Sequence, residues 1–252
     1  MDRSLSVNSG ARAGAGISKL VPGRKFLQRV GYGALGLGAA LFVGHLVWTG
    51  SGSNQWELAA DKDGVKVWTL KSPGTARLRV KAHAVIKSSL GGMVKLLEDL
   101  DSCADAYCYD TKLIRNVESV PGQNARYVRF KFDVPIPGFA TRDYVLFSEH
   151  VQDPKSKKLE LNIMAAPDAL PRDACCIRVT HLHNNWKLTP LATKELDIEF
   201  TQDTDLGGMH YVLANIALKE GMYKVMREMQ DFMNKPRYRN ARVDSIQELE
   251  AD

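Results

Sequence analysis

Two histidines on one predicted strand are the residues best placed for metal chemistry. His181 and His183 are two positions apart, so on a strand both side chains point to the same face. A catalytic zinc site needs a third protein ligand, and His150 is the only further candidate. Such pairs are more commonly hydrogen-bonded or surface histidines. We therefore predict no metal site, and we expect His181 and His183 to line an interior cavity and meet the polar group of a ligand.

The sequence lacks the common catalytic and nucleotide-binding motifs. No H-E-x-x-H, G-x-S-x-G, P-loop or C-x-x-C pattern occurs. Residues 31–36 match G-x-G-x-x-G, but that fingerprint needs a preceding strand and a soluble βαβ unit, whereas these glycines lie in an apolar segment. Glu195, Asp197 and Glu199 alternate with apolar residues, which is typical of the solvated face of a strand. We predict no catalytic residues and no cofactor.

The four cysteines form two short-range pairs. Cys103 and Cys108 are five residues apart, and on a continuous helix their side chains would point about 140° apart, so a disulfide between them requires a loop. The sequence leaves that bond open. Cys175 and Cys176 are adjacent, with Cα atoms about 3.8 Å apart across a trans peptide, below the usual disulfide range. They are predicted to be two independent thiols, one facing inward.

The net charge of +5 comes entirely from the N-terminus. Residues 1–30 hold six basic side chains and one acidic one, which leaves 28 basic and 28 acidic groups in residues 31–252. A nucleic-acid-binding domain carries a basic footprint on its own surface. The charge distribution therefore excludes nucleic acid as the partner.

An apolar segment near the N-terminus predicts a membrane anchor. Residues 30–48 contain no Asp, Glu, Lys or Arg, and nineteen helical residues cover roughly the ~30 Å hydrocarbon core of a bilayer. The basic tail 1–29 precedes the segment and the flexible linker 49–55 follows it. Five basic residues lie within twenty positions before the segment and two within twenty after it. The positive-inside rule then places the N-terminus in the cytoplasm and the folded domain outside it, on the periplasmic face of a bacterial inner membrane.

The same segment is compatible with two further kinds of N-terminal sequence. A cleaved signal peptide has a similar apolar core, although a basic region of 29 residues is long for one and no clean A-x-A site follows. An organelle transit peptide is the second alternative, because the first 30 residues are poor in acids and contain Arg and Ser. Gly36, Ala40 and Gly44 share one helix face, where small side chains would permit a weak homodimer within the membrane.

Residues 56–233 are predicted to form one α+β domain, followed by a charged tail at 234–252. The pattern gives two strand-like runs, a helical stretch at 88–100, a series of further strands, and a long helix at 206–233. Helices would pack on one face of an antiparallel sheet. A sheet of about eight strands curls, so a long helix across its concave side would leave a cavity.

The expected walls of that cavity are apolar. One strand offers alternating Val128, Phe130, Phe132 and Val134. The long helix offers an apolar stripe made of Met209, Val212, Leu213 and Ile216. The stripe continues through Met222, Val225, Met226, Met229, Phe232 and Met233. Methionine adapts to irregular apolar surfaces, so this stripe could form either an ordinary hydrophobic core or the wall of a ligand cavity.

Three motifs in order resemble those of START lipid-transfer domains. Residues 135–145, PIPGFATRDYV, resemble the P-x-P…R-D-[FY]-V segment of that family, and residues 185–190, NWKLTP, are similar to its G-x-W-x-L-x-P strand. Residues 203–208, DTDLGG, followed by Asn215, are similar to its entry into the last helix. The element order also agrees from residue 56 to about residue 233. His210 and Asn185 depart from the family pattern, standing where a proline and a glycine are usual.

The resemblance implies a helix-grip fold, in which a curved antiparallel sheet surrounds a long C-terminal helix and a lipid tunnel. It places Arg142, Tyr144 and Leu146 on the interior face of one strand, with Asp143 on the opposite face. A buried guanidinium must be paired, and the candidates are Asp133 and the ligand itself. The implied function is binding or transfer of one lipid. A polyketide cyclase or aromatase on the same fold, or a non-enzymatic interaction domain, are the alternatives.

Overall fold

The computed structural model describes residues 24–106, 108–117, 123–134 and 137–249, and it divides the chain into two compact units, residues 1–46 and 47–252. Helix α1 (Arg24–Gly50) contains the predicted anchor. Its residues 31–50 have a mean hydropathy of 1.4 and are not buried by the rest of the protein. This helix is long and apolar enough to cross a membrane, a property that it shares with signal sequences.

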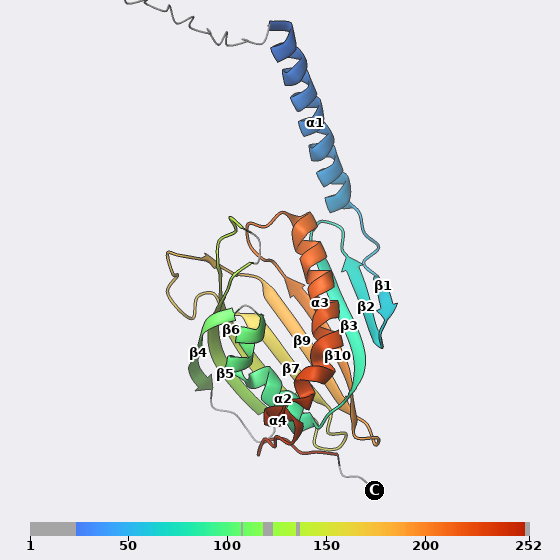
Figure 1. Ribbon diagram of the computed structural model, residues 1–252, viewed down its shortest axis with the longest axis vertical. Helices are drawn as coiled ribbons and strands as arrows, with labels where there is room; N and C mark the ends of the chain where they lie inside the picture. Colours follow the sequence, from blue (N-terminus) through green and yellow to red (C-terminus); the bar gives the residue numbers. More distant parts are fainter. Residues whose placement is uncertain (1–23, 107, 118–122, 135–136, 250–252) are drawn as a thin grey trace, which may run out of the picture. The chain divides into compact units, whose positions relative to one another are not determined.

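The second unit is built on one ten-stranded sheet. Neighbouring strands follow the order β1-β2-β3-β10-β9-β7-β6-β5-β4 and are antiparallel, while the two-residue β8 pairs in parallel with β6 (Figure 1). The strands are β1 (Trp56–Lys62), β2 (Val65–Lys71), β3 (Leu78–Lys87), β4 (Cys108–Val117), β5 (Gln123–Phe132), β6 (Arg142–Gln152), β7 (Leu159–Ala165), β8 (Ile177–Arg178), β9 (Leu182–Pro190) and β10 (Glu195–Thr204).

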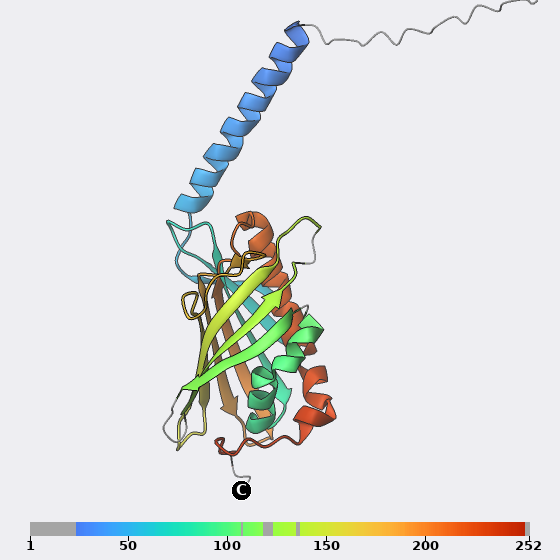
Figure 2. The same ribbon diagram turned by 90° about the vertical axis from the view of Figure 1, so that its left-hand side faces the viewer.

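The helices of this unit gather on one side of the sheet, as predicted for an α+β domain. Figures 1 and 2 show the long helix α3 (Tyr211–Asn234) running along the concave face of the curved sheet. α3 packs mainly against β2 and β3, with α2 (Leu90–Glu98) and α4 (Pro236–Arg239) near its C-terminal end. A 3-10 helix, η1 (Leu100–Ala106), packs against β4 at the other edge.

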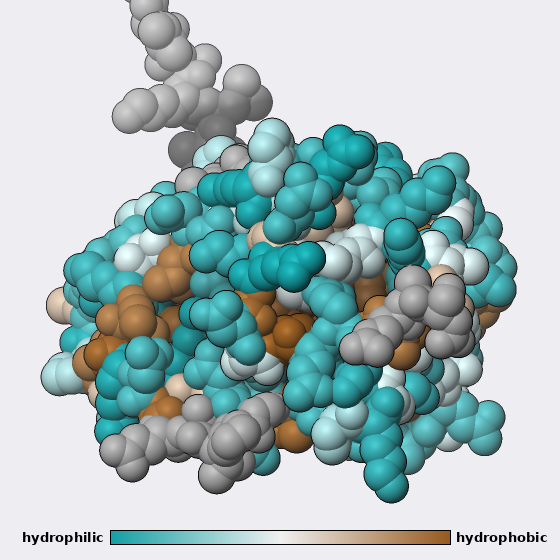
Figure 3. Space-filling view, turned by 90° about the horizontal axis from the view of Figure 1, so that it is seen from below, coloured by the Kyte–Doolittle hydropathy of each residue, from teal (hydrophilic) through white to brown (hydrophobic). Residues whose placement is uncertain are grey.

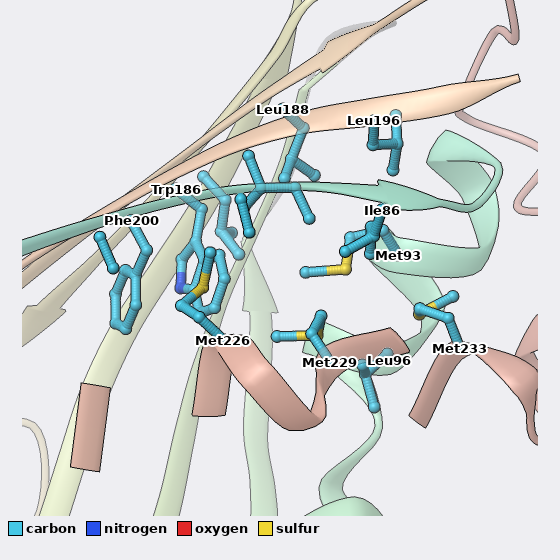
Figure 4. Packing of buried hydrophobic residues seen from close by; sticks show 14 of the residues in the cluster. Ile86, Met93, Leu96, Trp186, Leu188, Leu196, Phe200, Met226, Met229 and Met233 are labelled. Carbon is cyan, nitrogen blue, oxygen red and sulfur yellow. The ribbon is translucent and has the colours of Figure 1, made fainter. Parts of the chain in front are cut away.

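The main hydrophobic core lies between α3 and the inner face of the sheet. Met222, Met226, Met229 and Met233 are buried, as the predicted stripe requires. Figure 4 shows Met226 beside Trp186 of the sheet, while Met233 packs against α2 near Gly92. The rings of Trp186 and Phe200 stack with centroids 3.9 Å apart. Figure 3 shows that the end of the domain seen from below is mostly hydrophilic, with hydrophobic side chains visible in patches.

The prediction that the N-terminal part of the stripe faces the interior is wrong. Val212, Leu213 and Ile216 are 45%, 45% and 53% exposed, and Val225 is 41% exposed. The packed face instead runs through Ala214 and the other buried side chains Leu218, Met222 and Met226. Ile216 lies two positions from both Ala214 and Leu218, about 200° around the helix, so it points away from the sheet. The first turns of α3 are apolar on two faces, and periodicity alone does not say which face packs.

Candidate functional site

Strands β5 and β6 place five of the predicted site residues on one inner face. The register pairs Val128 with Leu146, Phe130 with Tyr144, and Phe132 with Arg142. The rings of Phe130 and Tyr144 stack with centroids 4.7 Å apart. Val128, Tyr144 and Leu146 belong to a second hydrophobic cluster, separate from the main core, and both phenylalanines pack against it. The joint placement of Phe130, Phe132, Arg142, Tyr144 and Leu146 is confirmed, while their contact with a ligand stays a prediction.

The inner face of the sheet is covered unevenly. Beside α3, the inward residues of β3 and β10, such as Ala82 and Ile198, are fully buried. On β5, Phe130 and Phe132 remain only half-buried, although they face the same side. Ile163 of β7 packs against both hydrophobic clusters and marks the boundary between them. Half-exposed apolar side chains on a concave face form a surface that an apolar ligand can cover.

Arg142 is buried and is held by backbone carbonyls. Its side chain is 1% exposed. The guanidinium donates from Nε to the carbonyl of Leu206 over 2.6 Å, from one terminal nitrogen to Gly207 over 2.7 Å, and from the other to Ala140. Burial lowers the pKa of Arg142, and burial also raises the pKa of its neighbour Tyr144 to about 12. Arg142 therefore joins the loop before β6 to the loop before α3.

Asp133, the predicted carboxylate partner of Arg142, is used elsewhere. Its Oδ1 accepts hydrogen bonds from the hydroxyl groups of Thr141, over 2.6 Å, and Tyr109, over 3.3 Å. Each guanidinium nitrogen of Arg142 donates to a carbonyl, which accounts for three of its five N–H groups, and Asp133 is not among its partners. Direct contact between Arg142 and a ligand stays a prediction.

The glycine pair before α3 shapes the carbonyls that Arg142 binds. Gly207 and Gly208 have φ angles of +62° and +64°, a conformation that residues with a side chain seldom adopt. A Cβ atom on Gly207 would approach Ile177 to 2.9 Å. Asp205 accepts a hydrogen bond from the amide of Gly207 over 2.9 Å. These constraints delay the start of α3 to Tyr211, five residues later than the predicted 206, and Met209 lies half-buried in the connecting loop rather than on the helix.

Asp143 makes buried ion pairs on the opposite face of β6. Its carboxylate is fully buried and accepts from Arg129 over 2.9 Å and from Arg178 over 2.8 Å. Arg129 also pairs with Asp173, whose pKa falls to about 2 because Lys131, the amide of Cys175 and Arg129 all donate to it. The R-D dipeptide thus connects β6 to the loop before α3 on one face and to Arg129 of β5 and Arg178 of β8 on the other.

A polar group on the inner face escaped prediction. His150 is 1% exposed, and its Nδ1 lies 3.1 Å from Glu98 Oε1. Within the described residues, His150 Nε2 and Arg126 Nε are buried without a hydrogen-bond partner. Arg126 faces Ser148 in the register of β5 and β6, next to the row of His150. His150 follows Arg142 by eight positions, and this even spacing in a strand indicates that both side chains lie on the same face. From the sequence alone we consider His150 only as a candidate zinc ligand.

Charge stabilises this polar group. Burial by itself would raise the pKa of Glu98, but the hydrogen bond with His150 and the nearby charges of Arg126 and Lys95 outweigh it, so the pKa is lowered. Glu98 is therefore ionised at neutral pH and accepts the proton on Nδ1 of His150. Nε2 of His150 and Nε of Arg126 are the buried atoms of this group that have no partner within the described residues, so each can make a hydrogen bond to a ligand.

The expectation that His181 and His183 face the cavity is wrong. Leu182 and Trp186 are the buried residues of β9, so the two histidines lie on the outer face. His183 is exposed, and Nε2 of His181 lies 2.9 Å from Asp203 Oδ1. His150 lies on the inner face, so the three histidines do not converge. On β9 the large apolar side chains point to the inner face, and the two histidines occupy the alternate positions, which point to the outer face.

Both cysteine pairs are disulfides. Cys103 and Cys108 are bonded with Cα atoms 5.0 Å apart, which settles a pairing that the sequence leaves open. Cys175 and Cys176 are also bonded, with Cα atoms 3.7 Å apart, and the prediction of two independent thiols is wrong. That prediction treated the Cα range of ordinary disulfides as a limit, whereas adjacent cysteines can close a small ring through their shared peptide bond. Sulfur atoms of this pair lie within 4.8 Å of a carboxylate oxygen of Asp173.

Substitution of Arg142 tests its structural role. Arg142→Leu should lower the free energy of unfolding by about 1–3 kcal/mol, because the partly buried carbonyls of Leu206 and Gly207 lose their donor. Urea denaturation of the full chain in detergent measures the change. Arg242→Leu, outside the buried region, is the matched control. Equal stability of Arg142→Leu and the parent protein would contradict the role.

The Glu98–His150 hydrogen bond predicts a pH dependence. Because the folded pKa of Glu98 is lowered, its contribution to stability is present above the unfolded pKa of about 4.3 and is lost as the pH falls through the folded pKa. Glu98→Gln should therefore cost ~1 kcal/mol at pH 7, and this difference should shrink below about pH 4. Denaturation between pH 7 and 3 measures it, with Glu149→Gln as the control on the outer face of β6. A constant difference at every pH would argue against an ionised Glu98.

Comparisons with known proteins agree with this geometry. No family model matches the chain. An uncharacterised protein of Pseudomonas aeruginosa is 29% identical over 160 residues, which cover 62% of this chain and 75% of that protein. The crystal structure of a STAR-related lipid transfer protein from Xanthomonas axonopodis matches with a TM-score of 0.60 and 21% identity, over 70% of this chain and 98% of that structure. The crystal structure of human STARD10 matches with a TM-score of 0.63 and 13% identity, over 86% of this chain and 81% of that structure. The folded domain of this chain therefore has the helix-grip fold of the StAR-related lipid-transfer domains.

Proposed function

We propose that the folded domain binds one lipid in its interior, against the inner face of β5, β6 and β7. The fold supports this proposal, because solved structures that share it are lipid-transfer proteins. The observation that carries it is the uneven covering of the inner face. α3 packs on β2 and β3, while Phe130 and Phe132 on β5 stay half-buried. Further along the same strand pair, Arg126 and His150 each have a buried nitrogen without a partner among the described residues.

The two kinds of surface suit the two ends of an amphiphile. Burial of an acyl chain contributes about 0.8 kcal/mol for each CH₂ group, in a bilayer or in a protein. Phe130, Phe132 and Ile163 would cover the acyl chain. Arg126 and His150 would hold the polar end, because each has a buried nitrogen that makes no hydrogen bond within the described part of the chain. Buried polar groups gain most from a ligand that completes their hydrogen bonds.

We further propose that α1 anchors the domain to a membrane, with the domain on the extracytoplasmic side. The apolar run, the basic residues before it and the scarcity of basic residues after it support this orientation. Two disulfides within the domain fit an oxidising compartment. A tether keeps the domain at high effective concentration near its lipid source. The homodimer through Gly36, Ala40 and Gly44 stays a prediction.

The pair formed by His150 and Glu98 favours one alternative, an enzyme on the same fold. A carboxylate that orients a histidine leaves Nε2 able to accept a proton, which is the arrangement of a general base. Substitution of His150 by Gln separates the two functions. If the protein only binds, the parent protein and His150→Gln should carry the same ligand species. A chemically different species that accumulates in the variant would indicate turnover.

Native mass spectrometry of the purified full chain tests the binding proposal. The parent protein should carry a co-purified lipid. Ala165→Trp should lose it, because Ala165 lies on the inner face opposite Leu146, where a larger side chain would occupy the space of the ligand. Val85→Trp, at a 45% exposed position, should keep it. Absence of any lipid from the parent protein, or equal occupancy in both variants, would contradict an interior binding site.

A further inference from the structure

The loop between β7 and β8 carries a disulfide that the proposed lipid site does not involve. It joins Cys175 and Cys176, which are neighbours in the chain. A disulfide stabilises a fold mainly by closing a loop of the unfolded chain, and here no residue lies between the two cysteines. Cys175 is exposed and Cys176 is half-buried, so a reductant can reach the bond. An accessible disulfide that adds little stability is of the kind that is reduced and reoxidised in function.

A carboxylate lies beside the two sulfur atoms. One oxygen of Asp173 and the sulfurs of Cys175 and Cys176 all lie within 4.8 Å of one another. The amide of Cys175 donates to this carboxylate over 3.2 Å. Lys131 and Arg129, on the outer face of β5, donate to it over 3.0 Å and 3.1 Å. Three donors thus fix the orientation of a carboxylate that is grouped with two sulfurs.

The spacing of these three atoms suits a metal ion once the bond between the sulfurs is reduced. Zinc lies about 2.3 Å from a thiolate sulfur and about 2.0–2.2 Å from a carboxylate oxygen, so ligand atoms of a tetrahedral ion are roughly 3.5–3.8 Å apart. Opening the S–S bond moves the sulfurs toward that separation. Thiolates select soft ions over Mg²⁺ and Ca²⁺. Two thiolates also balance the charge of a divalent ion, so Arg129 and Lys131 can keep their pairs with Asp173.

Other contacts hold the loop in place without the disulfide. Arg178 donates to the carbonyl of Leu170 over 3.1 Å and to that of Pro171 over 2.9 Å. After the cysteines, the amide of Ile177 donates to the carbonyl of Thr141 over 2.9 Å. Reduction therefore frees two thiols while the backbone on both sides of them stays fixed. Ligands that are already in position lose less conformational entropy when the metal binds.

We propose that Cys175 and Cys176, after reduction of their disulfide, bind one soft divalent metal ion of the zinc type together with the carboxylate of Asp173. A dithiol supplies the two electrons and two protons: it becomes a disulfide, and the two cysteines become thiols. Each thiol gives up its proton when the metal binds, so two protons are released. The three protein ligands leave the fourth position of a tetrahedral ion to water.

Cadmium titration of the reduced full chain in detergent tests this site. Cys103→Ser/Cys108→Ser removes the other disulfide and leaves Cys175 and Cys176 as the cysteines of the chain. A phosphine reduces their bond, adds no competing thiol, and is removed under nitrogen before Cd²⁺ is added. The ultraviolet absorption of the cadmium–thiolate bond reports binding, and a pH indicator in weak buffer counts the released protons. Circular dichroism checks that each variant is folded.

We expect one Cd²⁺ for each chain and two released protons in the reduced protein, and no such absorption in the oxidised protein. Asp173→Asn should weaken binding about tenfold or more, while Asp168→Asn, at an exposed position of the same loop, should bind like the parent protein. If Cys103→Ser/Cys108→Ser does not fold, the reduced parent protein takes its place.

The reverse double variant, Cys175→Ser/Cys176→Ser, keeps Cys103 and Cys108 as a matched pair of thiols without Asp173. After reduction it should bind Cd²⁺ at least about tenfold more weakly. Equal affinity of the two cysteine pairs would overturn the proposal. Equal affinity of Asp173→Asn and Asp168→Asn, or a Cys175–Cys176 bond that the phosphine leaves intact as counted by thiol alkylation, would also overturn it. Lipid occupancy is a separate measurement, so failure of the metal site and failure of the lipid site are distinguishable.

Discussion

The hydrogen bonds of Arg142 are the constraint on which the interior depends. A buried guanidinium must satisfy its donors, and here it does so with carbonyls of Ala140, Leu206 and Gly207. The last two belong to a loop whose left-handed glycines set where α3 begins. On the other face of the same strand, Asp143 binds Arg129 of β5 and Arg178 of β8. Arg178 in turn donates to carbonyls of the loop between β7 and β8. One dipeptide therefore positions the helix on one face and, through Arg178, this loop on the other.

With α3 placed over β2 and β3, the sheet has two unequal halves. Methionines fill the space beneath the helix and form a closed core with Trp186 and Phe200. The half formed by β5 and β6 keeps half-buried aromatic rings and the polar group of Glu98, His150 and Arg126. The inner face of β6 is itself buried, so the half-buried side chains of β5, such as Phe130 and Phe132, are the surface that we propose for the ligand.

Several features could be predicted because one physical signal dominated each. The alternation of Arg142 and Asp143 fixed their faces, and the spacing of Met222, Met226, Met229 and Met233 fixed the buried stripe of α3. Other features depended on competition between two signals. The start of α3 is apolar on two faces, so Val212, Leu213 and Ile216 were assigned to the wrong one. His181 and His183 were assigned by their own spacing, although Leu182 and Trp186 decide the parity of the strand. The pairing of His150 with Glu98 joins residues 52 positions apart, and no local pattern reveals it.

The proposed position of the lipid is the inner face of β5, β6 and β7. Photolabelling with a lipid that carries a diazirine on its acyl chain tests this position, because the reactive carbene marks the residues it touches. The full chain would be labelled in its membrane, digested, and mapped by mass spectrometry. We expect adducts on inner-face residues of these strands, such as Phe130, Phe132 and Ile163, and none on outer-face neighbours such as Phe147. Adducts confined to α1 and to the exposed surface of the domain, with the inner face unlabelled, would contradict it.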